Sequence, residues 1–122
     1  PKDHVILIAA HHPLIDVGLT EPVRTRGGRA ALERLAAAGA DAVLTGHVHY
    51  PFDVPVEKAD RTVRLIGAGT LSKRLRHSPP AFNELRVEGR RFETIARTMS
   101  PAPKTVLGEG RADPAPTERP RD

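Results

Sequence analysis

Two pairs of histidines are the residues of this sequence whose types and spacing could do chemistry. His47 and His49 stand one residue apart after a glycine, and His11 and His12 are adjacent and followed by a proline. Neutral imidazole suits Mn, Fe, Zn or Co, and the absence of cysteine restricts metal ligands to histidine and carboxylate. A His-x-His pair alone is weak support for a metal site, so the surrounding elements decide its value.

Each histidine pair follows a short apolar run that predicts a buried strand. Residues 5–10 lead into His11, and residues 42–44 lead into the second pair. Between them, residues 29–38 have high helix propensity, and Gly39 fits a helix C-cap. We therefore expect a strand–helix–strand unit with parallel strands and the usual right-handed crossover. Both histidine pairs would then lie at one edge of a sheet, just beyond the carboxyl ends of the strands.

The remaining sequence predicts further strands and a tail. Residues 62–66 alternate in character like a strand, and residues 82–87 and 91–97 predict a hairpin. From residue 100 to residue 122 the sequence is rich in proline and charge and poor in apolar residues, which predicts disorder. We therefore expect one folded part at 1–99 and a proline-rich disordered tail at 100–122.

The order and spacing of these motifs resemble those of the calcineurin-like metallophosphoesterases. The strand running into His11-His12-Pro13 resembles the family's His-x-Pro segment, and Gly46-His47-Val48-His49 resembles its Gly-His-x-His motif. The resemblance covers residues 4–97 and implies the C-terminal half of a metallophosphoesterase-type α/β sandwich with a mixed β-sheet. The family's earlier motifs, Asp-x-His, Gly-Asp-x-x-Asp and Gly-Asn-His-Asp/Glu, do not occur in these 122 residues. The implied partner is therefore the N-terminal half of the same domain, and the fragment alone is expected to be inactive.

The resemblance also implies an activity. The family hydrolyses phosphomonoesters or phosphodiesters with a hydroxide that is activated by two divalent ions (Mn, Fe, Zn or Co). Cyclic nucleotides are among the possible substrates of this chain. His11 and His47 would bind one ion, and His49 would bind the other. Arg74 is a candidate for binding the phosphate group of the substrate, and the alternative is that it is a solvated surface arginine. His12 would contact and orient the metal-binding side chains, face the substrate or have a purely structural role.

Composition limits the other function classes. The 19 basic residues against 15 acidic ones give a net charge of +4, which suits phosphate esters without indicating nucleic acid. Aromatic residues make up only 3% of the chain, too few for a platform that stacks single-stranded bases. The sequence shows neither a membrane-spanning apolar run nor a signal peptide, and the expected location is the cytoplasm. A buried strand so near Pro1 fits a chain whose first half lies upstream.

Three other functions stay open from the sequence. In the first, the chain as given is a truncated, non-catalytic fragment that binds metal weakly. In the second, it is a basic module for nucleic-acid or protein interaction. A nuclease is a further option, because repair nucleases share this motif set. Nucleic acid as a partner is the less favoured choice, given the low aromatic content and the mild charge.

Overall fold

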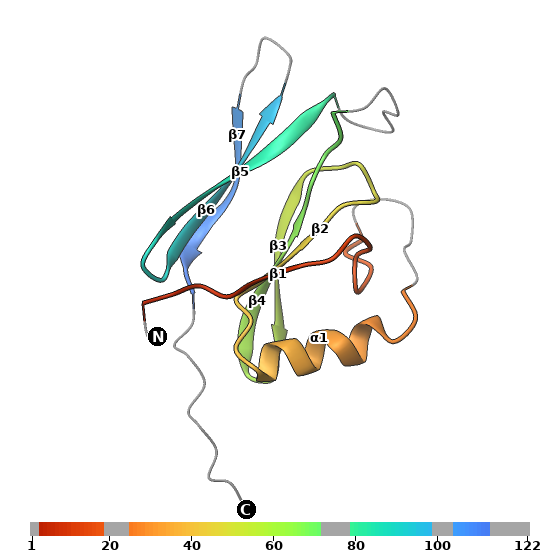
Figure 1. Cartoon of the computed structure of the whole chain (residues 1–122), viewed down its shortest axis with the longest axis vertical. Helices are drawn as coiled ribbons and strands as arrows, with labels where there is room; N and C mark the ends of the chain where they lie inside the picture. Colours follow the sequence, from red (N-terminus) through yellow and green to blue (C-terminus); the bar gives the residue numbers. More distant parts are fainter. Residues whose placement is uncertain (1–2, 19–24, 72–78, 99–103, 113–122) are drawn as a thin grey trace, which may run out of the picture.

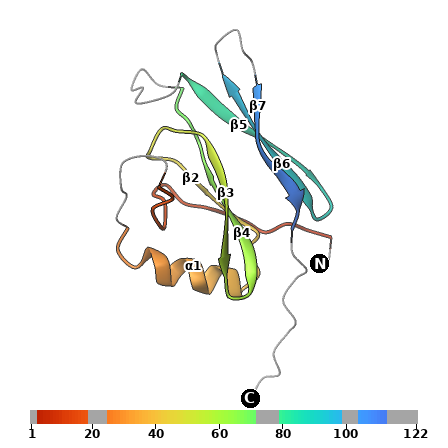
Figure 2. The same ribbon diagram turned by 180° about the vertical axis from the view of Figure 1, so that it is seen from behind.

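A computed structural model describes residues 3–18, 25–71, 79–98 and 104–112 of the chain. The described part folds into three layers, in which a three-stranded sheet faces a four-stranded sheet and α1 covers the far side of the latter (Figure 1). Figure 2 shows the same layers from behind. The elements are β1 (Leu7–Ala9), α1 (Gly28–Ala37), β2 (Ala42–Thr45), β3 (Phe52–Lys58), β4 (Arg61–Gly67), β5 (Ala81–Glu88), β6 (Arg91–Thr98) and β7 (Lys104–Arg111).

The four-stranded sheet is mixed, as the sequence predicts. Its strand order is β1-β2-β4-β3, with β1, β2 and β4 parallel and β3 antiparallel to β4. Ile8 stands opposite Val43 in the pairing of β1 with β2, so the predicted strand–helix–strand unit is confirmed. No helix in the described residues combines the length and apolar character needed to cross a membrane.

Helix α1 packs on the four-stranded sheet through its apolar stripe. Leu32 and Ala36 are fully buried in one cluster with Val43, Val63 and Phe52. Burial of such side chains is the main force that fixes a helix on a sheet, because the helix alone is too short to be stable. The helix therefore packs against β2, β3 and β4 of this sheet, and no residue of the helix belongs to the histidine group found among the described residues.

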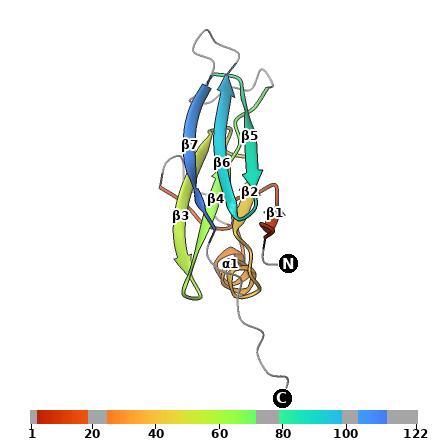
Figure 3. The same cartoon turned by 90° about the vertical axis from the view of Figure 1, so that its left-hand side faces the viewer.

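The three-stranded sheet contains the predicted hairpin. β5 and β6 pair antiparallel around Gly89 and Arg90, and β7 adds to the free side of β6 (Figure 3). On this sheet, hydrogen bonds from Arg86 and Arg97 lower the pKa of Glu84.

Two strands were not predicted. Residues 104–111 form β7, so the prediction of a disordered tail from residue 100 is wrong for this strand; residues 100–103 and 113–122 lie outside the described residues. Composition averages over the prolines on both sides of β7 and so hides a short pairing segment. β3 was missed because Pro55 argues against a strand, yet β3 is an edge strand where Pro55 is exposed, and edges tolerate proline.

One arginine joins the two sheets near β3 and β7. Arg64 forms an ion pair with Asp53 and donates through Nη1 to the main-chain oxygen of Phe92 at 2.8 Å. Its guanidinium also lies 3.8 Å from the centre of the Phe92 ring, and Nη2 is 3.3 Å from Thr94 Oγ1. Gly108 on β7 approaches this group so closely that a side chain there would collide with Asp53. The contact seals one side of the sandwich, where β7 lies against β3.

A second buried ion group links the sheets through Asp41. Its carboxylate accepts hydrogen bonds from Arg61 at 3.0 Å and from both terminal nitrogens of Arg90 at 3.0 Å. It also accepts from the main-chain N–H of Ile6 at 2.7 Å, and Arg90 donates to the main-chain oxygen of His4 at 2.6 Å. Asp41 is 2% exposed, so this pairing occurs almost without solvent. It ties the turn of the β5–β6 hairpin to the beginning of β1.

Candidate metal centre

The pairing of β1 with β2 continues past the ends of both strands and sets the histidines side by side. Ala10 donates its main-chain N–H to Leu44 at 2.9 Å, and Gly46 donates to His11 at 2.9 Å. The two parallel strands therefore leave the sheet together, and the residues that follow them stay adjacent. This local pairing explains why histidines 36 positions apart in sequence meet in space, as the strand-end argument predicts.

A tight turn presents the ring of His47. The main-chain N–H of Val48 donates to the oxygen of Gly46 at 2.7 Å, and His47 between them has a φ of 66°. This pattern is a γ-turn with a positive central φ, which is rare and strained for a residue with a side chain. Val48 is 6% exposed and packs in the core under α1, so it anchors the turn. The histidine before it is thereby directed outward.

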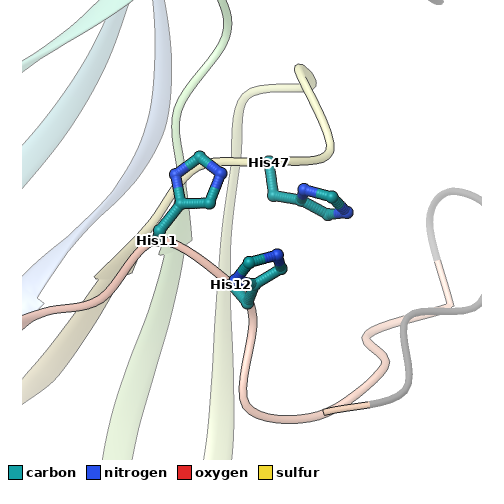
Figure 4. A group of neighbouring side chains, drawn as sticks. All are labelled: His11, His12 and His47. Carbon is teal, nitrogen blue, oxygen red and sulfur yellow. The ribbon is translucent and has the colours of Figure 1, made fainter.

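Three imidazoles gather at this edge of the sheet. The ring centres are 4.4 Å apart for His12 and His47, 4.8 Å for His11 and His12, and 5.6 Å for His11 and His47. One ring nitrogen from each lies within 4.8 Å of the other two. Figure 4 shows the three rings around one space between the loop after β1 and the loop after β2. His11 and His12 are exposed and His47 is half-buried, so a solute can reach the group.

The structure places the predicted site residues in different ways. His11 and His47 come together as predicted. His12 joins them, although the sequence-based prediction leaves its role open. His49 is not part of this group among the described residues, and its role as a ligand for a second ion stays a prediction. Arg74, the candidate for substrate phosphate, lies outside the described residues.

The donors present fit a divalent transition metal. A tetrahedral zinc ion holds its nitrogen ligands at about 2.0–2.1 Å, which puts two such nitrogens about 3.4 Å apart. The observed limit of 4.8 Å is about 1.4 Å longer than this, so the three rings would have to move closer together to bind one ion. The group holds no carboxylate among the described residues. Its donors are neutral imidazoles, which suit Zn, Co, Fe or Mn better than Mg or Ca.

An apolar cavity lies at the same ends of β2 and β4, has no histidine of the group in its wall and was not predicted from the sequence. It has a volume of about 510 Å³ and opens between the two sheets at the carboxyl ends of β2 and β4. Thr45, two residues before His47, belongs to its wall, as do Leu44, Ile66 and Phe82. Asn83 fixes the wall by donating to the oxygen of Gly67 at 2.8 Å. No sequence signal marks this cavity, because its lining comes from strands of both sheets.

The fold of this chain is similar to that of two solved structures. No protein-family model and no curated protein matches this chain. Among solved structures, a single mutant of Vps29 from Entamoeba histolytica is similar at 17% identity and a TM-score of 0.46, over 79% of this chain and 52% of that one. Vacuolar protein sorting 29 from Cryptosporidium parvum is similar at 19% identity and a TM-score of 0.48, over 77% of this chain and 48% of that one. The chain thus spans about half the length of both structures. The likeness concerns the arrangement of the elements, and no conclusion about activity rests on it.

Proposed function

We propose that this chain carries the histidine ligands of a metal-dependent phosphoesterase and forms the C-terminal part of its domain. The observation that supports this most is the convergence of His11 and His47 from the ends of two paired parallel strands, with ring centres 5.6 Å apart. His11 and His47 would hold one divalent ion, and His49 would hold a second. The carboxylate that joins two such ions would come from residues upstream of Pro1.

The residues of this chain would bind the metal ions and orient the substrate, and the ions would supply the positive charge and the activated water for hydrolysis. Divalent ions, when bound, lower the pKa of a coordinated water and place positive charge beside the phosphoryl oxygens. The strained turn at His47 and the main-chain bond from Gly46 to His11 hold the ligands in place before an ion arrives. The cavity of about 510 Å³ at the ends of β2 and β4 suits the organic group of a phosphomonoester or phosphodiester, because its wall is mostly apolar.

A non-catalytic metal-binding domain is the second candidate. It is favoured by one observation, namely that the group of possible ligands contains no carboxylate among the described residues. The two candidates differ in what the reading frame upstream of Pro1 encodes. The phosphoesterase predicts Asp-x-His and Gly-Asn-His there, and a frame without them would leave the metal-binding domain as the function.

The activity is tested on a chain that includes the residues encoded upstream of Pro1. With Mn²⁺ or Zn²⁺ added, we expect it to hydrolyse bis(4-nitrophenyl) phosphate or 4-nitrophenyl phosphate, and we expect His49→Ala to abolish turnover without changing the circular dichroism spectrum. His4→Ala is the matched control, because His4 is exposed and lies outside the histidine group. Turnover that survives His49→Ala would contradict the assignment.

A further inference from the structure

We propose that His12 is the third imidazole on the ion held by His11 and His47, which makes this a three-histidine zinc site whose fourth position is left for the carboxylate of the proposed function. The inference rests on the proposed function for the presence of an ion, and it adds a ligand that the motif resemblance does not contain. It also names the metal, since three neutral imidazoles are a known ligand set of Zn²⁺. His49 stays available for a second ion.

The spacing of the rings supports a shared ion. A zinc ion about 2.0–2.1 Å from a ring nitrogen lies about 3.2 Å from the ring centre, so two rings on a tetrahedral ion have centres about 5 Å apart. The three observed separations, 4.4, 4.8 and 5.6 Å, lie on both sides of this value. The ring centres therefore lie within roughly 1 Å of the separation that a common ion requires.

A purely structural role for His12 does not explain its surroundings. His12 is exposed, so it does not fill the core, and within the described part of the chain its ring makes no hydrogen bond or ion pair. In a continuing strand, neighbouring side chains would point to opposite faces. The chain bends at His11 and His12 instead, and both rings turn to the same space (Figure 4).

Zinc binding to the 122-residue chain and its variants tests the proposal. Titration in competition with a chromophoric chelator at pH 7.5 gives the affinity, and we expect His12→Ala to weaken it by more than about 100-fold, beyond the roughly 10- to 100-fold that loss of a group outside the ligand set costs. His4→Ala, at an exposed histidine outside the group, should stay within threefold of the unchanged chain. If His12→Ala alters the circular dichroism spectrum, His12→Gln, which keeps a polar side chain of similar length, replaces it.

A second measurement identifies the ligand directly. On addition of Zn²⁺, the ¹⁵N resonance of one ring nitrogen of His12 should move to the range of metal-bound imidazole, together with those of His11 and His47. If His12→Ala binds zinc with unchanged affinity and the His12 resonance does not move, the inference is overturned. If His11→Ala and His47→Ala still lose binding in that case, the proposed function keeps its metal site. If those two variants also bind zinc like the unchanged chain, the proposed function loses its metal site as well.

Discussion

His47 and His49 both have positive φ angles, 66° and 59°, on either side of the buried Val48. Such angles cost a residue with a Cβ of the order of 1–3 kcal/mol, and they persist only where the surrounding structure enforces them. Here the enforcement comes from Val48 and from the hydrogen bond that closes the turn at Gly46. Glycine would adopt this backbone more easily than histidine does at either position.

The strain at His47 leads to a prediction about two variants that both lack the ring. His47→Gly should unfold at a higher urea concentration than His47→Ala, with a difference of about 1 kcal/mol in unfolding free energy. Glycine at this position removes the free-energy cost of the positive φ, and this gain is larger than the loss that comes from the greater chain entropy of glycine in the unfolded state. Urea titration followed by circular dichroism, without metal, measures this difference. An alanine variant as stable as the glycine variant would show that the turn carries no strain.

At the scale of elements, the histidines are placed by the pairing of β1 with β2, and this much followed from the sequence. Two unbroken apolar runs with a helix between them predict parallel neighbours, and parallel neighbours bring their carboxyl ends together. The part played by His12 did not follow, because side-chain direction beyond a strand depends on the bend of the loop. β7 also escaped prediction, since Gly108 and Gly110 weaken its strand character.

Gly108 gives a prediction about how β7 packs. A Cβ at this position would lie 2.7 Å from the carboxylate of Asp53, so Gly108→Ala must displace the strand or the ion pair with Arg64. We expect a loss of about 1–3 kcal/mol in unfolding free energy, as for other overpacked sites. Val106→Ala, at a half-exposed position of the same strand, is the control and should change stability by less than about 0.5 kcal/mol. Equal stability of the two variants would mean that β7 does not pack as described.

For the whole molecule, two arginines that pair with aspartates, Arg64 and Arg90, also connect one sheet to the other. Arg64 with Asp53 seals the side near β3 and β7, and Arg90 with Asp41 fixes the hairpin turn beside β1. Nothing in the sequence indicates which acid meets which base, because Asp41 and Arg90 are 49 residues apart. Single-sequence patterns report local periodicity, whereas such pairs are determined by how complete sheets stack.

Loss of the Asp41 carboxylate should be among the most destabilising changes in the chain. Asp41→Asn leaves Arg61 and Arg90 buried opposite a neutral group, and breaking a buried pair in this way costs about 3–5 kcal/mol. The expected result is a large fall in the urea midpoint or complete unfolding. Asp3→Asn is the control, since the Asp3 side chain is 81% exposed, and it should behave like the unchanged chain. A small effect of Asp41→Asn would show that the two sheets do not depend on this group.

The central claim is that neighbouring strands deliver imidazole nitrogens to one metal ion. X-ray absorption spectroscopy at the zinc edge, on the chain loaded with one equivalent of Zn²⁺, tests it most directly. We predict three imidazole nitrogens at about 2.0–2.1 Å with the outer-shell scattering typical of histidine rings. We also predict loss of that signal in the double variant His11→Ala, His47→Ala. A first shell made of oxygen alone, or a spectrum that the double variant leaves unchanged, would contradict the claim.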